Sequence, residues 1–389
     1  MEHFQRPQIP KLNLLAANNI KFLHPHYSWK NILLSLPRVD QNPAGKLGVH
    51  HQTALIGCQI VANNVFDRSY LSLDKEGIQR VDRTIGSDEV LTDNEYYLIV
   101  PDVDAPYPVV PSFSDWQFPH GGIPSSWPEV EPSTGVSEPF QRCGVTKYSF
   151  AIESAHLVPK EEATWFNLNS MDFTLGQYAT INTSANLLPL RADVHKIFDK
   201  RWWAIVPKIG PDGGAPKYVS HILHAQAGEV FPEHHNVEVQ YLHQLSRPYL
   251  FARFAWAVLI STKWFVTSGM GRKVVRLQAA SDDTPTWLTM SLPGEQLKSL
   301  YLAGGSRSAT PQKKRRTTDT PAEEEMESSD SSCSDDDEDV WDALQRRNRR
   351  LQQTSSSTET APDVGTTLKS VGEAVAPVEE EEMVSGLGA

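Results

Sequence analysis

The change in composition at about Gly304 limits what this chain can fold into more than any other feature of its sequence. Beyond this point the apolar periodicity ends, and runs of Ser, Thr, Glu and Asp such as EEEMESSDSSCSDDDEDVWDALQ replace it. Such a segment cannot bury enough apolar surface to offset the entropy lost on ordering. We therefore predict a disordered acidic tail over residues 305–389, and the folded part must be built from the residues before it.

The tail also carries most of the net charge. Residues 305–389 hold 19 acidic and 10 basic side chains, a net charge of −9 out of −12, which leaves −3 on the first 304 residues. A nearly neutral folded part does not exclude a nucleic-acid partner. Two basic clusters interrupt the tail, KKRR at Lys313 to Arg316 and RRNRR at Arg346 to Arg350. They resemble nuclear localisation signals, which a nuclear import receptor would bind.

Cysteine usage and the apolar stretches favour an intracellular protein. Cys58, Cys143 and Cys333 are far apart and form no CxxC pair, so neither a disulfide framework nor a zinc knuckle is indicated. The N-terminus lacks the basic start and apolar core of a secretory signal. The most apolar stretch, Tyr249 to Val266, contains two basic residues and is shorter than the roughly twenty residues that span a bilayer. We predict a nuclear or cytoplasmic protein without a membrane segment, in which this stretch is a buried helix.

Two folded segments are predicted before the tail. Short apolar runs separated by Pro, Gly, Asn and Asp indicate a small β-rich or α+β domain over residues 1–132. It is expected to end in a Pro-rich linker, Pro119 to Pro132. A second domain, over residues 139–266, is predicted to carry the chemistry. His50 and His51 have no partner at metal-ligand spacing, so we expect core or surface histidines.

The second segment alternates short strands and helices, which predicts the α+β class. RCGVTKYSFAIESAHLVP suggests two extended pieces around a turn near Thr146 to Tyr148. LRADVHKIFDKRW has the apolar spacing of a helix, and EEATWFNLN suggests a shorter one. WWAIVPKIG and YVSHILHA are joined by the loop GPDGGAP, which indicates a hairpin.

Four polar residues of this segment recur at spacings that suit an active site. Asn186 follows His156 by thirty residues, His195 follows Asn186 by nine, and Asp199 follows His195 by four. Residues four apart share one face of a helix, so an imidazole and a carboxylate can point at the same place. This is a metal-ligand spacing, although solvated pairs with the same spacing are common.

Three sequence pieces, in the order strand, loop and helix, resemble the HNH nuclease family and its ββα-metal fold. The pieces are AHLVP, a turn asparagine followed by an apolar run, and HKIFD. The resemblance is close over about Gln141 to Val206, and more loosely residues 29 to 257 are similar to uncharacterised fungal proteins that carry such a domain. It implies an HNH core with helical and hairpin additions, preceded by the β-rich domain and followed by the acidic tail.

The resemblance implies a role for each polar residue. His156 would be the general base that takes a proton from the attacking water, which suits an imidazole with a pKa of about 6.5. His195 and Asp199 would bind one divalent ion, Mg²⁺ or Mn²⁺. Asn186 would either join the metal shell or hold its loop through backbone hydrogen bonds. The implied activity is hydrolysis of phosphodiester bonds in nucleic acid, with DNA as the expected substrate.

The chain departs from the family pattern at two positions. Many HNH enzymes have an Asp or His directly before the general base as a further metal ligand, whereas this chain has Ala155, which cannot coordinate. Glu153, two residues earlier on the strand, is the predicted replacement. Lys147 stands where relatives usually have a turn glycine, which costs little if the turn keeps φ negative. The zinc-binding cysteine pairs of some relatives are absent, so Cys143 is expected to be a small core residue.

Basic residues around the motif are expected to contact the phosphate backbone: Lys160, Arg191, Lys196 and Lys200. Two other functions stay open. Ala155 favours a catalytically silent HNH-derived module that binds nucleic acid or protein, and the acidic-flanked serines of the tail suit a phosphorylated nuclear scaffold. The complete set of base, asparagine, histidine and aspartate favours the endonuclease.

Overall fold

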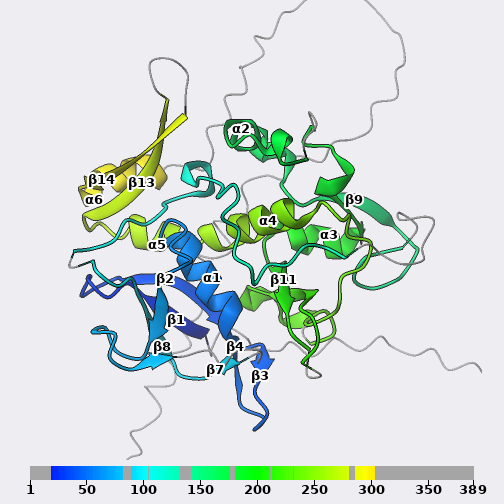
Figure 1. Cartoon of the computed structure of the whole chain (residues 1–389), viewed down its shortest axis with the longest axis horizontal. Coiled ribbons are helices and arrows are strands. Elements are labelled where there is room, and N and C mark those ends of the chain that lie inside the picture. The colour runs from blue at the N-terminus through cyan, green and yellow to red at the C-terminus, as the bar shows by residue number, and fades with distance from the viewer. Residues whose placement is uncertain are drawn as a thin grey trace, which may run out of the picture. The chain divides into compact units, whose positions relative to one another are not determined.

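The computed structural model describes residues 19–81, 89–103, 105–131, 142–175, 180–210, 213–230, 232–279 and 285–302 (Figure 1). The predicted disordered tail and its two basic clusters lie outside these residues. Helices and strands are mixed along the described part of the chain, which confirms the predicted α+β class.

The first strands form two sheets. The larger has the order β2, β1, β8, β5, β6, with β1 (Asn19–Leu23), β2 (Ile32–Pro37), β5 (Tyr70–Ser72), β6 (Arg80–Val81) and β8 (Glu95–Ile99). β1 and β8 are parallel, and the other neighbours are antiparallel. The smaller sheet has the order β3 (Asp40–Gln41), β4 (Leu47–His50) and β7 (Val90–Leu91). Alternation sets the buried face, because Ile20 and Phe22 are buried whereas Lys21 is exposed and pairs with Glu95.

Helix α1 (His51–Val61) packs against β2 and against helix α4. His50 caps its N-terminus, since the ring accepts a hydrogen bond from a first-turn backbone N–H at 3.3 Å. A Cβ atom at Gly57 would lie 3.0 Å from the side chain of Leu34, so glycine permits the close approach of helix and sheet. His50 and His51 are both buried, which confirms that they are core histidines.

Helix α4 (Arg247–Leu259) runs through the core. Every residue from Tyr249 to its end is buried, as expected of a helix that is apolar on all sides. The predicted buried helix is therefore confirmed, with one interruption. The Thr262 hydroxyl donates to the Leu259 carbonyl at 2.7 Å, and a separate helix, α5 (Thr262–Val266), follows.

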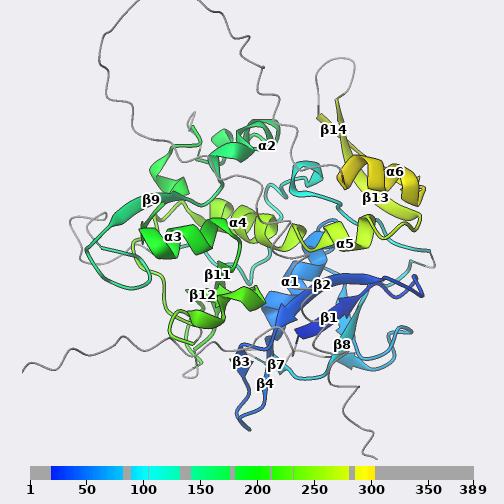
Figure 2. The same ribbon diagram turned by 180° about the vertical axis from the view of Figure 1, so that it is seen from behind.

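The middle of the chain contains two antiparallel strand pairs. β9 (Ile152–His156) pairs with β10 (Leu187–Arg191), and helix α3 (Ala192–Asp199) follows β10 directly. β11 (Trp203–Lys208) and β12 (Lys217–Ile222) form the predicted hairpin. β9 and α3 lie at one end of α4, away from α5 (Figure 2). Short helices connect the elements: η2 (Phe113–Asp115), η3 (Lys160–Glu162), α2 (Ala163–Leu168), η4 (Met171–Leu175), η5 (Ser184–Asn186) and η6 (Ala225–Glu229).

A hairpin and a helix follow α5, in a region where the sequence predicts no element. β13 (Arg272–Ala279) and β14 (Pro285–Leu292) are antiparallel, and α6 (Gly294–Tyr301) packs against α5. The backbone of Val109 bonds to both sides of Val274, which ties β13 to the N-terminal half.

Buried apolar side chains from both predicted domains form one core. The ring of Trp127 is buried against Phe251 and Phe254, at centroid distances of 5.0 and 5.5 Å. The predicted linker, Pro119 to Pro132, therefore contributes Trp127 to this core. The division into domains at residues 132 and 139 stays a prediction about sequence modules. None of the helices in the described ranges is long and apolar enough to cross a membrane.

Candidate active site

β9 and β10 form the frame of the candidate site. Their register pairs His156 with Leu187 and Glu153 with Leu190. Ala155 is fully buried, whereas His156 is half-buried and Glu153 is exposed. β9 therefore presents a carboxylate near its start and an imidazole at its end.

Helix α3 adds His195 and Asp199 to one face, as the spacing predicts. Nε2 of His195 lies 3.2 Å from Oδ2 of Asp199, and Nδ1 lies 2.8 Å from Oε2 of Glu153. Burial alone would lower the pKa of His195, but hydrogen bonds and charges from Asp199 and Glu153 raise it above its usual value. The imidazole is thus held between two carboxylates.

Glu153 occupies a different place from the one predicted for it. It approaches the ring nitrogen opposite the one that faces Asp199, so the three side chains do not converge on one point. That Glu153 binds the same ion as His195 and Asp199 stays a prediction, and this geometry favours a different role. A carboxylate on the far nitrogen of a histidine fixes its tautomer and its orientation instead.

His156 is held by a residue that the sequence analysis missed. Nε2 of His156 lies 2.9 Å from Oδ1 of Asn182. The amide oxygen accepts, so Nε2 carries the proton and a neutral ring has its lone pair on Nδ1. Burial lowers the pKa of His156, and the positive charges of Lys160 and His195 lower it further, against the opposing effects of Asn182 and Asp199. His156 is therefore neutral at pH 7, as a general base must be.

Asn186 is fully buried and bonded to backbone on three sides. Its Oδ1 accepts from the N–H of Val158 at 2.7 Å, and its Nδ2 donates to the carbonyls of Val158 and Ile181 at 3.1 and 2.7 Å. Of the two predicted roles, this geometry favours the second, because the amide oxygen is enclosed and already bonded. Asn186 therefore connects, through hydrogen bonds, the loop after His156 and the segment that leads into β10.

Arg253 of α4 joins the two halves of the site and was also missed. It is fully buried, and its guanidinium donates to the carbonyl of Leu157 at 3.4 Å and to that of Phe198. It also lies 3.6 Å from Oδ1 of Asp199, between the rings of Phe198 and Trp256. Burial lowers the pKa of Arg253 to about 9, which leaves it charged at pH 7. The only available sign in the sequence is an arginine inside an apolar helix.

The predicted nucleic-acid contacts divide into two groups. Three lysines are exposed around the site: Lys160, Lys196 and Lys200. Arg191 forms a two-fold pair with Asp193, at 2.6 and 2.7 Å, so its charge is compensated within the chain.

The turn before β9 does not meet the condition under which replacing its glycine costs little. Lys147 has φ of 64°, not a negative φ. For a residue with a side chain this conformation costs roughly 1–2 kcal/mol. The Lys147 N–H donates to the carbonyl of Cys143 at 3.0 Å, and Arg142 donates to the carbonyl of Lys147 at 3.1 Å. Cys143 is fully buried, which confirms that it is a core residue.

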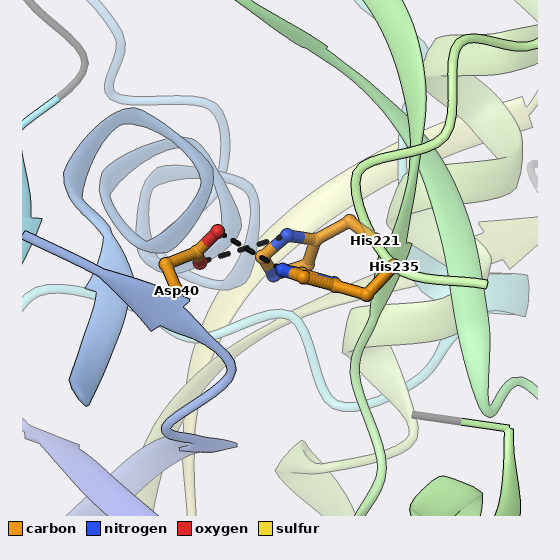
Figure 3. Close-up of side chains that lie close together, drawn as sticks. All are labelled: Asp40, His221 and His235. Atoms are coloured by element: carbon orange, nitrogen blue, oxygen red, sulfur yellow. Dashed lines mark hydrogen bonds and ion pairs between the residues drawn. The ribbon is translucent and has the colours of Figure 1, made fainter. Parts of the chain in front are cut away.

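A second cluster of possible metal ligands lies in the core, where Asp40 of β3 meets His221 and His235 (Figure 3). Their ligand atoms all lie within 4.8 Å of one another. Nε2 of His235 is 3.0 Å from Oδ1 of Asp40, and Nδ1 of His221 is 3.8 Å from Oδ2. No sequence pattern marks this cluster, because Asp40 and His235 are separated by 195 positions.

A lysine already occupies the place that a cation would take in this cluster. Nζ of Lys208 lies 2.5 Å from Oδ1 of Asp40 and 2.7 Å from Oδ1 of Asn236. Nδ1 of His235 accepts from the N–H of Ile222 at 3.2 Å, so a neutral ring carries its proton on Nε2, toward Asp40. Burial alone would raise the pKa of Asp40, yet the positive charge of Lys208 and the hydrogen bond from His235 hold it well below its usual value. We assign this cluster to a buried ion-pair network that ties β3 to the β11–β12 hairpin.

The buried histidines predict that stability falls in mild acid. Burial lowers the pKa of His24 to about 3, that of His221 well below its usual value, and that of His235 as well, so all three take up protons less readily in the folded protein than in the unfolded chain. The unfolded chain takes up protons below pH about 6.5, so their contribution is complete above that pH and is lost as the pH falls. We expect the free energy of unfolding to fall by up to about 1.4 kcal/mol per pH unit for His24 and for His221 between pH 6 and 5. Urea unfolding over this range measures the slope, and His221→Gln should reduce it; an unchanged slope contradicts the assignment.

The site thus consists of an antiparallel strand pair that runs directly into a helix, with His195 held between Glu153 and Asp199. Residues 134–206 match the family model described as HNH endonuclease. The resemblance to the HNH nuclease family is thus confirmed over this segment. Neither the curated proteins nor the solved structures contain a match to the chain.

Proposed function

We propose that this protein is a metal-dependent endonuclease of the HNH type that hydrolyses phosphodiester bonds in nucleic acid, with DNA as the expected substrate. The observation that carries the proposal is the β9–β10–α3 unit, which has the order of a ββα-metal core. It brings a neutral His156 into the electrostatic reach of His195 and Asp199. The match of residues 134–206 to the family model supports it independently.

His195 and Asp199 have the donor spacing that a divalent ion requires. Two ligands at about 2.1 Å from one ion and at right angles lie about 3.0 Å apart. The separation of 3.2 Å between Nε2 of His195 and Oδ2 of Asp199 fits this value. Mg²⁺ or Mn²⁺ would complete its shell with water and the scissile phosphate, and would stabilise the charge that develops on the leaving oxygen.

The chain's own residues perform the remaining steps. His156 takes the proton of the attacking water on Nδ1, while Asn182 keeps the ring in the tautomer that leaves this atom free of a proton. Glu153 orients His195 through Nδ1, so that Nε2 faces Asp199. Asn186 fixes the loop that follows the base. Lys160, Lys196 and Lys200 would contact the phosphate backbone.

A catalytically silent module that binds nucleic acid or protein is the second candidate. Ala155 favours it, because the position before the base offers no donor atom. Import into the nucleus through the basic clusters of the tail stays a prediction, since both clusters lie outside the described residues.

Incubation of the purified chain with supercoiled plasmid separates the two candidates. The endonuclease should convert the plasmid to nicked and linear forms with Mg²⁺ or Mn²⁺, and a chelator should stop the reaction. Binding without cleavage in either ion would contradict the endonuclease and favour the silent module. A parallel incubation with single-stranded DNA and RNA defines the class of nucleic acid.

A further inference from the structure

Two aromatic side chains point into solvent on the loop that leads into β9. Tyr148 is 63% exposed and Phe150 is 83% exposed. Among the described residues, these are the two most exposed phenylalanine or tyrosine side chains. Burial of such rings is a main source of folding stability. Two solvent-exposed rings within three residues therefore indicate a surface that contacts another molecule.

The backbone holds this loop firmly although its side chains are exposed. The carbonyl of Tyr148 accepts from the N–H of Cys143 at 2.8 Å, and the carbonyl of Ala151 accepts from the N–H of Ala192 at 2.9 Å. Lys147 and Ala151, which flank the aromatic pair, both have positive φ, 64° and 51°. Strained residues persist only where the surrounding structure fixes them, and they are common at functional sites. The loop is therefore preorganised to present the two rings.

The rings lie beside the proposed active site and among basic side chains. The guanidinium of Arg191 lies 5.2 Å from the ring centroid of Tyr148, and Arg191 pairs with Ile152 in the strand register. The next residue of β9, Glu153, contacts His195. Segment 142–151 contains two basic residues, Arg142 and Lys147, and no acidic one. This charge suits a polyanion better than an apolar protein surface, although Arg191 itself is paired with an aspartate of α3.

We propose that Tyr148 and Phe150 form a stacking platform for unstacked bases, so that the preferred nucleic acid is single-stranded or locally unpaired next to the cleavage point. The inference rests on the proposed function and deepens it by naming the substrate class. An aromatic ring stacks on a base only where the base has left its neighbours, and every base offers such a face, so the contact is independent of sequence. Bases inside a regular duplex offer no free face.

Fluorescence anisotropy with the full chain tests the platform without cleavage. The background is His156→Ala in the presence of a chelator, and the probes are a labelled mixed-sequence single strand and the matching duplex. Tyr148→Ala together with Phe150→Ala should weaken single-strand binding by about 5-fold to 150-fold for each stacked base lost, and duplex binding much less. The exchanged pair Tyr148→Phe with Phe150→Tyr should retain single-strand affinity.

Trp29, on the connection between β1 and β2, supplies a matched control. It is 61% exposed, and Nζ of Lys30 lies 4.3 Å from its ring centroid. Trp29→Ala should leave single-strand affinity unchanged.

Equal losses of affinity for the single strand and the duplex, or no loss of affinity for the single strand, would overturn the platform. Absence of nucleic-acid binding by the parent would also overturn it and assign the surface to a protein partner. Plasmid cleavage by the wild type is scored separately, so failure of the platform and failure of the endonuclease proposal are distinguishable.

Discussion

Replacement of His156 by alanine is expected to abolish divalent-dependent nicking while the fold and the metal affinity stay nearly unchanged. A general base contributes typically about 10²–10⁴-fold to a rate, so the nicking rate should fall by that factor. His156 donates to Asn182 and is separate from the His195–Asp199 pair that we propose as metal ligands. The measurement is the initial nicking rate with Mn²⁺, together with a metal titration followed by thermal unfolding.

His195→Ala is the matched comparison, because it should weaken metal binding as well as cleavage. The pH dependence of the wild type supplies a further check. Burial lowers the pKa of His156, so with saturating metal, which keeps His195 deprotonated, protonation of the base should slow nicking only at a pH below the usual histidine value of about 6.5. Cleavage by His156→Ala at the wild-type rate would contradict the assignment of the base.

Helices and strands could be predicted where a single stretch of sequence carries the pattern that specifies them. The spacing of LRADVHKIFDKRW placed His195 and Asp199 on one face, which the 3.2 Å contact confirms. The Gly/Pro loop between β11 and β12 marked the hairpin, and the apolar run from Tyr249 marked α4. The hairpin of β13 and β14 escaped prediction, because its first strand, RKVVRLQA, mixes charged and apolar residues without regular alternation.

Contacts between distant residues could not be derived from any local pattern. The pairing of β9 with β10 brings His156 to Leu187 across 31 positions, and only the family resemblance suggested that the two segments meet. Lys208 reaches Asp40 across 168 positions, so no periodicity encodes that ion pair. The contact that Glu153 makes with Nδ1 of His195 could not be predicted for a similar reason. Strand alternation indicated which residue lies near His195, but not which ring nitrogen it approaches.

The hydrogen bonds of Asn186 favour one of its two predicted roles. Its position matches the family motif, in which the asparagine either binds the metal or holds its loop through backbone hydrogen bonds. Three bonds to the backbone of Val158 and Ile181 use its amide, and its side chain has no access to solvent. Substitution of such a residue leaves buried backbone groups without partners, so motif residues that never touch a substrate can still be required for activity.

Arg253→Met is expected to lower both stability and the nicking rate of the molecules that remain folded. Methionine fills similar space but removes the guanidinium that donates to the carbonyl of Leu157, at a cost of about 1–3 kcal/mol for a buried group left unpaired. The carbonyl of Phe198 loses one of its donors and keeps the N–H of Arg201, at 2.9 Å. Asp199 also loses a neighbouring positive charge, although its partial exposure reduces that effect. We expect a total loss of about 2–5 kcal/mol in the free energy of unfolding, measured in urea.

A purely structural role for Arg253 would lower stability alone, so the comparison needs a second buried arginine. Arg272 is equally enclosed, stacked on Tyr27 and Phe265 at 4.3 and 4.2 Å, and donates to the carbonyl of Lys30 at 2.8 Å, far along the chain from the motif. Arg272→Met should cost a similar free energy of unfolding but leave the nicking rate per folded molecule unchanged. The rates are compared at a temperature where both variants are folded, as judged by near-ultraviolet circular dichroism. Equal rates in the two variants would mean that Arg253 supports the core and does not position the loop after His156 against the end of α3.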